Sequence, residues 1–177
     1  MKVVDIDSGA PVPPGTAGML LVKGPNVMRG YLGKPEKTAE VLHDGWYTTG
    51  DVAVVEDDGF LTIIDRLSRF SKIGGEMVPH LRIEEKLQEL DGSTEQVFAV
   101  TAVPDEKKGE RIMTVTTLAG AKLDAVLQKL AGCDLPALWK PKAGQFVHVD
   151  ALPVLGTGKL DLRAVKTVAM SQTVEVV

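Results

Sequence analysis

The sequence is poor in cysteine and in aromatic residues, and its 24 acidic residues outnumber its 20 lysines and arginines. Cys133 is the single cysteine among 177 residues, so no internal disulfide can form, which is typical of a reducing compartment. Aromatic residues make up only 5% of the chain. The net charge of −4 and the pI near 5.4 argue against a general nucleic-acid-binding protein, for which a basic face is expected.

Long hydrophobic runs are also missing. No apolar stretch is long enough to span a membrane, and the N-terminus lacks the basic-then-apolar pattern of a signal peptide. We therefore expect a cytoplasmic protein without a transmembrane segment. What the sequence does have is 44% hydrophobic and 25% charged residues, which predicts one ordinary folded domain or two small ones.

The chain is organised around residues 45–79. A polar turn is predicted at residues 48–51 (TTGD). A β-hairpin is predicted next, because apolar residues alternate on both sides of Asp58-Gly59, a strong hairpin signal. A charge pair follows at 65–66 (DR), and then residues 72–76 (KIGGE), which we interpret as a flexible loop.

Short strands with Gly and Pro between them are predicted before this charge pair, and alternating helices and strands after it. The fold class is therefore α+β, with a small β-barrel-like segment over residues 1–65 and an α+β domain over residues 66–177. Strands are expected at 3–7, 19–23, 27–32, 96–103, 111–118 and 145–149, and helices at 35–42, 80–90, 123–132 and 161–168, the last capped by Asp161.

Four blocks in order resemble the C-terminal portion of adenylate-forming enzymes, a family that includes acyl-CoA synthetases, luciferases and peptide-synthetase adenylation domains. They are residues 24–31 (GPNVMRGY), 45–51 (GWYTTGD), 65–76 (DRLSRFSKIGGE) and 152–159 (LPVLGTGK). The chain is most similar to acyl-acyl-carrier-protein synthetases, including the synthetase half of 2-acylglycerophosphoethanolamine acyltransferase. The resemblance implies the mobile C-terminal domain of such an enzyme, preceded by the end of its large domain.

The resemblance also implies an activity and its residues. The family joins a carboxylic acid to AMP with ATP and Mg²⁺, and then passes the acyl group to a thiol. By this resemblance Asp51 accepts hydrogen bonds from the ribose hydroxyls, and Arg66 donates to the same ribose or a nearby phosphate. Lys159 contacts the acyl carboxylate and the phosphate, as a mobile point charge can. Thr49 and Trp46 are placed at the nucleotide site in the same way.

The thiol-transfer step is assigned to other residues. Gly74, Gly75 and Glu76 are expected to line the path of a phosphopantetheine arm, which belongs to coenzyme A or to acyl carrier protein. Ser68 lies at the hinge about which the mobile domain rotates, where the family usually has Asp or Lys. The acid implied is a fatty acid of unspecified length. An association of the parent enzyme with the inner membrane stays open.

Each of these residues also has a plainer interpretation. Asp51 is a common turn residue, Lys159 alone would be an ordinary surface lysine, and Trp46 alone would be a packing residue. Residues 152–159 do not form a phosphate-binding P-loop, because Pro153 stands where that motif needs Gly and Leu160 where it needs Ser or Thr. The three histidines, His43, His80 and His148, lack metal-ligand spacing, so no metal site is predicted.

The family's Ser/Thr/Gly-rich loop for the ATP phosphates does not occur in this sequence. We therefore expect a piece of a longer ligase that is inactive alone and needs a missing N-terminal domain. The alternative is a stand-alone binding module that docks a carrier protein or a separate N-terminal subunit. Carrier proteins are acidic, so two cationic groups are candidate docking sites: Lys107, Lys108 and Arg111, and Lys140 and Lys142.

Overall fold

A computed structural model describes residues 1–171 of the chain. The chain divides into two compact units, Met1–Ser68 and Arg69–Val177, which we call the N-terminal and the C-terminal unit. The division lies shortly after the predicted boundary between Asp65 and Arg66. No helix within residues 1–171 is long and apolar enough to cross a membrane.

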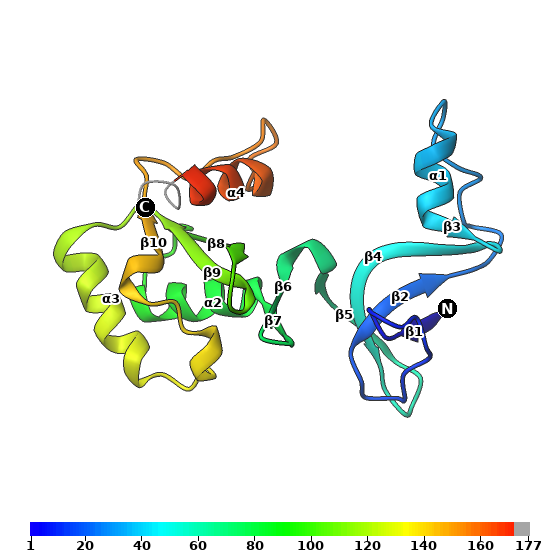
Figure 1. Ribbon diagram of the computed structural model, residues 1–177, viewed down its shortest axis with the longest axis horizontal. Coiled ribbons are helices and arrows are strands. Elements are labelled where there is room, and N and C mark those ends of the chain that lie inside the picture. Colours follow the sequence, from blue (N-terminus) through cyan, green and yellow to red (C-terminus); the bar gives the residue numbers. More distant parts are fainter. Residues whose placement is uncertain (172–177) are drawn as a thin grey trace. The chain divides into compact units, whose positions relative to one another are not determined.

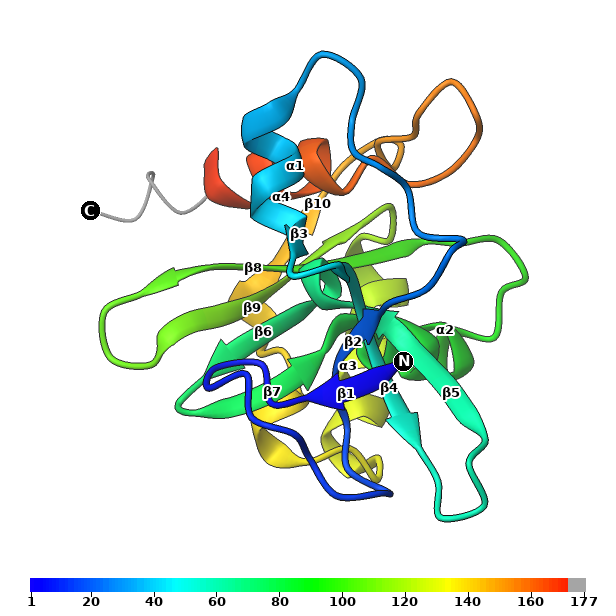
Figure 2. The same ribbon diagram turned by 90° about the vertical axis from the view of Figure 1, so that its right-hand side faces the viewer.

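The N-terminal unit is built around one long strand, β4. All pairs in its five-stranded sheet are antiparallel: β4 pairs with β2 on one edge and with β3 and β5 on the other, and β1 pairs with β2 (Figure 2). Val3, Leu20 and Ala53 form its buried core. The elements are β1 (Lys2–Val4), β2 (Gly18–Val22), α1 (Pro35–Val41), β3 (Leu42–His43), β4 (Trp46–Val55) and β5 (Leu61–Arg66).

Two predictions for this unit are wrong. Residues 48–51 do not form a turn but lie inside β4, where Gly50 has a φ of +77° and the pairing with β2 shifts register. The Gly-Asp pair therefore marks a strand irregularity instead of a chain reversal. The strand expected at 27–32 is absent, because the amide of Val27 closes a turn on the carbonyl of Gly24. The hairpin around Asp58-Gly59 is confirmed.

The sheet of the N-terminal unit is open among the described residues. No pairing within residues 1–171 joins β1 to β5. The strand pairing therefore does not support the predicted barrel-like shape. It shows a mixed α/β chain whose first unit is mainly antiparallel sheet.

The C-terminal unit is an α+β arrangement of two sheets and three long helices. β8 and β9 pair antiparallel, and β10 runs parallel to β9 on its other edge. The elements are β6 (Phe70–Ile73), β7 (Glu76–Pro79), α2 (His80–Asp91), β8 (Phe98–Asp105), β9 (Gly109–Thr116), α3 (Gly120–Gly132), β10 (Phe146–His148) and α4 (Leu162–Ser171), with 3₁₀ turns at Ala137–Trp139 and Ala143–Gln145. A further 3₁₀ turn, Leu67–Arg69, spans the boundary between the two units.

Helices cover both faces of the three-stranded sheet. Side chains alternate along β8, so that Phe98 and Val100 pack with α2 and α3, whereas Ala99 and Val103 pack with α4. Figure 1 shows α4 on one side of β8 and β9, and α2 and α3 on the other. This three-layer packing explains the near-continuous apolar run in β8, since both of its faces are buried.

The predicted helices of the C-terminal unit are confirmed at residues 80–90, 123–132 and 161–168, with ends that differ by a few residues. Asp161 caps α4 as expected, because its Oδ1 accepts hydrogen bonds from the amides of Arg163 and Ala164.

The flexible loop predicted at 72–76 is wrong. Ile73 pairs with Glu76, and Gly74 and Gly75 form the two-residue turn between β6 and β7 with φ values of +58° and +93°. A tight hairpin turn of this kind needs positive φ at both central residues, which glycine supplies at no steric cost. The two glycines therefore fix a turn instead of loosening a loop.

Candidate functional site

Asp51, Arg66 and Thr49 form one polar cluster in the N-terminal unit. Asp51 on β4 and Arg66 on β5 are register partners, and Arg66 Nε lies 3.0 Å from Asp51 Oδ1. Arg66 Nη1 also donates to the carbonyl of Thr49 at 2.9 Å. The Arg66 side chain is 62% exposed and the Asp51 side chain 21%, so the two strands hold a charged pair that solvent or a ligand can reach.

Local backbone geometry explains the cluster. The Thr49 hydroxyl donates to the carbonyl of Leu20 on β2 and accepts from the amide of Asp51, so it fixes the strand on both sides of Gly50. The left-handed φ of Gly50 lies between them, and a Cβ there would stand 3.6 Å from Arg66 Nη1. The irregularity of β4 at Gly50, which makes the sequence look like a turn, therefore positions Asp51 next to Arg66.

A tyrosine pair beside this cluster had no sequence signal. The hydrogen bond to Tyr31 and partial burial raise the pKa of the Tyr47 phenol, and the charges of Arg66 and Asp51 also act on it. Tyr31 comes from the loop before α1 and Tyr47 from β4, so sequence spacing could not have paired them.

Trp46 packs with a different set of residues. The ammonium group of Lys2 lies 4.5 Å from the centre of its ring and that of Lys23 lies 5.9 Å away. Lys23 also donates to the carbonyl of Asp44. These cation–π contacts fit the packing interpretation of Trp46, and its placement at the nucleotide site stays a prediction.

Lys159 lies on a small hairpin of the C-terminal unit. Val154 and Leu160 form an isolated antiparallel bridge, the amide of Leu155 donates to the carbonyl of Lys159 at 2.8 Å, and the amide of Gly158 donates to the carbonyl of Leu155 at 2.8 Å. Lys159 is therefore exposed on a turn that backbone hydrogen bonds hold in place.

The Gly74-Gly75 turn lies against a cation-lined cavity of the same unit. The amide of Gly74 donates to the carbonyl of Lys108 at 3.0 Å, which ties the turn to the connection between β8 and β9. The adjoining cavity has a volume of about 490 Å³. Ile73 and the acidic Asp105 line it. So do both cationic groups predicted from the sequence, which are Lys107, Lys108, Arg111, Lys140 and Lys142.

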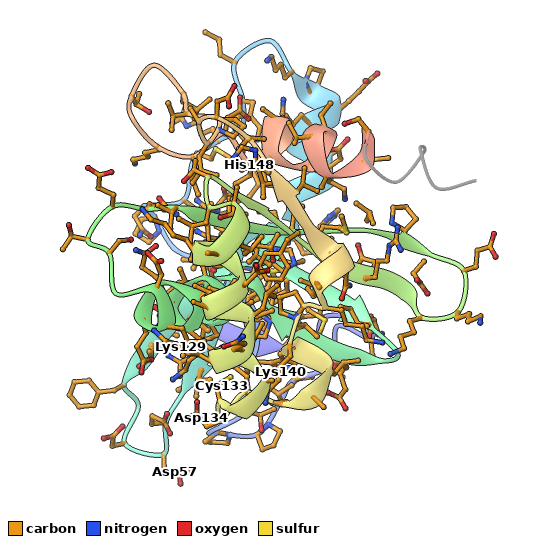
Figure 3. All side chains as sticks on the ribbon, turned by 90° about the vertical axis from the view of Figure 1, so that its left-hand side faces the viewer. Asp57, Lys129, Cys133, Asp134, Lys140 and His148 are labelled. Atoms are coloured by element: carbon orange, nitrogen blue, oxygen red, sulfur yellow. The ribbon has the colours of Figure 1, made fainter. Side chains whose placement is uncertain are left out.

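The cations around this cavity are not equivalent. Lys140 donates to the carbonyls of Ala131 and Cys133 at the end of α3, so its charge is used to cap that helix (Figure 3). Arg111 Nε is buried and has no hydrogen-bond partner within residues 1–171. A buried donor without a partner costs free energy.

The predicted site residues thus fall into two groups. Thr49, Asp51 and Arg66 meet in the N-terminal unit, whereas Lys159 and the Gly74-Gly75-Glu76 turn belong to the C-terminal unit. Ser68 is exposed at the end of the N-terminal unit. Within residues 1–171, no group of three or more His, Cys, Asp or Glu side chains could hold a metal ion.

Comparison with known proteins finds CoA synthases and CoA ligases among the relatives of the chain. Feruloyl-CoA synthase of an Amycolatopsis species is 41% identical over 160 residues, which are 86% of this chain and 31% of the relative. A long-chain-fatty-acid–CoA ligase of Bacillus subtilis is 38% identical over 156 residues, or 87% of this chain and 27% of the relative. No protein-family model matches the chain.

Solved structures are similar to nearly the whole chain. ATP-bound MatB from Rhodopseudomonas palustris has a TM-score of 0.74 and 31% identity, covering 94% of this chain and 33% of that protein. The amide bond synthetase McbA from Marinactinospora thermotolerans has a TM-score of 0.72 and 31% identity, covering 94% and 34%. The homologues of the chain are therefore acyl- and aryl-CoA ligases, and the chain spans about a third of their length.

Proposed function

We propose that the chain is part of an ATP-dependent acid–thiol ligase. In the first half-reaction a carboxylate oxygen of the acid attacks the α-phosphorus of ATP, and pyrophosphate leaves. In the second, a thiol sulfur attacks the acyl carbonyl, AMP leaves, and the thiol proton passes to solvent. Support comes from the CoA-ligase relatives and from the two groups of polar residues on the two units.

The Asp51–Arg66 pair is the observation that carries this proposal. The backbone already orients both charged groups, and a carboxylate in such a position can accept from vicinal ribose hydroxyls while the guanidinium donates to ribose or phosphate oxygens. A preorganised pair loses little freedom when it binds a nucleotide. ATP supplies the phosphoryl chemistry, and Mg²⁺ would be held by its phosphates.

We assign to Lys159 the role of stabilising the negative charge that develops as the acyl-adenylate forms. Its ammonium is exposed on an ordered hairpin, and a lysine on a fixed turn can stabilise charge at phosphorus once it reaches the nucleotide. The chain holds about a third of its relatives' length, and we propose that it forms no acyl-adenylate without the remainder.

Acid-dependent ATP–pyrophosphate exchange by the parent enzyme tests this assignment. We expect Lys159→Ala to lower the exchange rate by roughly 10²–10³-fold, as loss of one transition-state charge contact does. Lys122→Ala, an exposed lysine on α3, serves as the control and should keep the wild-type rate. An exchange rate that Lys159→Ala leaves unchanged would contradict the role given to this residue.

The acceptor of the acyl group is proposed to approach along the Gly74-Gly75 turn. The adjoining cavity carries the exposed Lys107, Lys108 and Lys142, which suit the phosphate of a phosphopantetheine arm or the acidic surface of a carrier protein. Both acyl carrier protein and coenzyme A fit this chemistry. A fatty acid stays the proposed acid, by similarity to the long-chain ligase.

Charge reversal separates the lysines that face the acceptor from the one that caps a helix. We expect Lys142→Glu and Lys108→Glu to raise the KM for the acceptor about tenfold without changing pyrophosphate exchange, because a like charge then opposes an acidic partner. Lys140→Glu should instead lower the melting temperature, because Ala131 and Cys133 lose their donor. An acceptor KM that neither reversal changes would remove the cavity from the acceptor path.

A second candidate function rests on the self-contained C-terminal unit. Its two buried clusters and its cation-lined cavity need no residue of the N-terminal unit. The chain could accordingly act as a module that docks a carrier protein or a separate subunit. Tight binding of a carrier protein to the isolated chain, in the absence of any other domain, would favour this candidate.

A further inference from the structure

The cation-lined cavity of the C-terminal unit has two walls. Apart from Ile73, its lining comes from residues 105–112, at the connection between β8 and β9, and from residues 137–145. Helix α3 separates these two segments in the sequence, so the chain itself does not fix the distance between them. Among the described residues, five cationic side chains line the cavity against one carboxylate, that of Asp105. The net charge therefore favours an anion.

Asp105 holds the first wall in shape. Its Oδ1 accepts hydrogen bonds from the amides of Lys107 and Lys108, both at 3.0 Å. The backbone hydrogen bonds from Lys108 and Lys107 lower the pKa of the Asp105 carboxyl group. The carbonyl of Lys108 also accepts from the amide of Gly74, so the wall is tied to the turn between β6 and β7. The one carboxylate of the cavity thus stabilises the turn that carries the two lysines.

Gln145 joins the second wall to the first. Its Nε2 donates to the carbonyl of Ile112 on β9 at 2.7 Å, and its Oε1 accepts from the amide of Lys142 at 2.7 Å. The amide of Gln145 also donates to the carbonyl of Lys142 at 2.8 Å, across the 3₁₀ turn Ala143–Gln145. One side chain therefore sets how far the backbone of Lys142 lies from β9.

We propose that Gln145 is a positioning residue that holds the two cationic walls at a fixed spacing, so that Lys142 and the lysines of the first wall bind one phosphate group together. A carboxamide suits this task because it donates and accepts at the same time and carries no charge. It therefore joins the walls without neutralising a lysine. Within residues 1–171, the ammonium groups of Lys107, Lys108 and Lys142 form no ion pair, so their charge is available to a ligand.

The class of ligand rests on the proposed function. The phosphate of a phosphopantetheine arm offers acceptor oxygens that bind strongly to ammonium groups. A site whose walls are already held at the required spacing loses less conformational freedom when this phosphate binds. Gln145 acts through the position of Lys142 and does not touch the ligand.

Titration of the full chain with phosphopantetheine, followed by ¹⁵N–¹H NMR, tests the proposal without ATP or acid. We expect the amide signals of Lys107, Lys108 and Lys142 to shift with a common Kd. Pantetheine, which lacks the phosphate, is the matched ligand and should shift none of the three. Shifts that are equal for the two ligands, or absent with both, would overturn the proposal.

Substitution of Gln145 separates positioning from a purely structural role. Gln145→Met removes both side-chain hydrogen bonds at similar length, so it should raise the Kd for phosphopantetheine about fivefold, the effect of roughly one lost hydrogen bond. Exchange of the Lys142 amide with solvent should become faster as well. Gln145→Glu still accepts from that amide but cannot donate to the carbonyl of Ile112, so it should protect the amide and still weaken phosphate binding.

A matched glutamine provides the control. Gln96 is exposed and lines a different cavity, and Gln96→Met should bind phosphopantetheine as the wild type does. Gln145→Asn, whose side chain is too short to reach both partners, replaces Gln145→Met if that variant does not fold. A folded Gln145 variant with a lower melting temperature but an unchanged Kd would show a structural role only and would overturn the proposal.

Further titrations distinguish the sources of the phosphate. Shifts with coenzyme A indicate a free cofactor, and shifts with acyl carrier protein that require its phosphopantetheine arm indicate a protein-borne one. Equal shifts with and without the arm would mean that the acidic surface of the carrier protein binds instead, and would contradict the proposal. Phosphate binding that depends on Gln145, in a chain whose parent forms no thioester, would uphold the positioning role and reject the proposed reaction.

Discussion

The two units bury their apolar residues in different ways. The C-terminal unit covers both faces of its sheet with helices and has two buried clusters, whereas the N-terminal unit buries one small cluster around Val3, Leu20 and Ala53. On β5 and the turn before it, Phe60, Ile63 and Ile64 stay exposed, at 74%, 57% and 37%. A strand with apolar side chains exposed on both of its faces marks a surface suited to contact with further protein.

This difference teaches which unit is self-sufficient. The C-terminal unit is the size and construction of a small independent domain, while the N-terminal unit is an open sheet with an apolar edge strand. Exposed apolar residues also lie beside the proposed site in the C-terminal unit, where Val154 and Leu155 share the hairpin with Lys159. Both units therefore present apolar surface next to the residues assigned to the nucleotide.

Expressing the two units as separate chains is the most demanding test of the difference between them. Residues 69–177 alone should unfold in one cooperative transition, whereas residues 1–68 alone should show no cooperative transition. A chain of this length buries only about 60% of its unfolded surface, and the exposed edge adds no stability. Thermal unfolding followed by circular dichroism checks both, and cooperative melting of residues 1–68 would show that the N-terminal unit needs no partner.

Acid should destabilise the C-terminal unit through His80. This buried imidazole at the start of α2 accepts or donates a hydrogen bond with Ser71, and burial, Arg69 and Lys166 lower its pKa from 6.5 to about 4. The start of a helix also disfavours a positive charge. Between these two values the unfolded chain binds a proton that the folded chain does not, so stability is fully present above about 6.5 and is lost as the pH falls toward 4.

The expected loss from this residue is about 3 kcal/mol across that range, at about 1.4 kcal/mol for each pH unit. His80→Gln should flatten the pH dependence, because the replacement cannot be protonated but can still bond to Ser71. His148→Gln, at an exposed position on β10, is the control and should behave as the wild type does. Urea unfolding at several pH values measures this, and an unchanged slope in His80→Gln would refute the assignment.

The smallest expected effect is on the stability of the N-terminal unit and concerns Gly50 in β4. Gly50→Ala should cost about 1 kcal/mol of stability, because an L-residue is strained at positive φ. The new Cβ would only touch Arg66 Nη1 at an ordinary distance, so the pair with Asp51 should survive. Gly33→Ala, at a φ of +68° with nothing nearby, carries the same strain and is the matched control in chemical denaturation. A much larger loss at Gly50 would mean that the irregularity of β4 depends on more than its φ.

The sequence predicts periodic elements well and irregular ones poorly. The helices of the C-terminal unit follow from apolar spacing and the Asp161 cap, since both signals are local. The turn predicted at 48–51 was wrong because Gly-Asp is equally typical of a turn and of a strand irregularity. The flexible loop at 72–76 was wrong because two glycines also suit a tight hairpin.

Contacts between residues that are far apart in the chain could not be predicted from the sequence. Spacing does not reveal that Tyr31 meets Tyr47 or that Arg69 pairs with Glu84, because tertiary packing creates these contacts. The two cationic groups were predicted separately, and only the fold shows that they line one cavity. Lys140 was assigned to docking from charge alone, whereas the structure shows that it caps α3.

Calorimetric titration with a non-hydrolysable acyl-adenylate analogue tests the central claim most directly. The claim is that each unit holds part of a nucleotide site that is completed only by the rest of a ligase. The account predicts no measurable binding to the chain alone, and tight binding to the parent enzyme that Asp51→Ala and Lys159→Ala both weaken. Tight binding to the chain alone, lost in both variants, would contradict it and would show that the chain forms a complete site by itself.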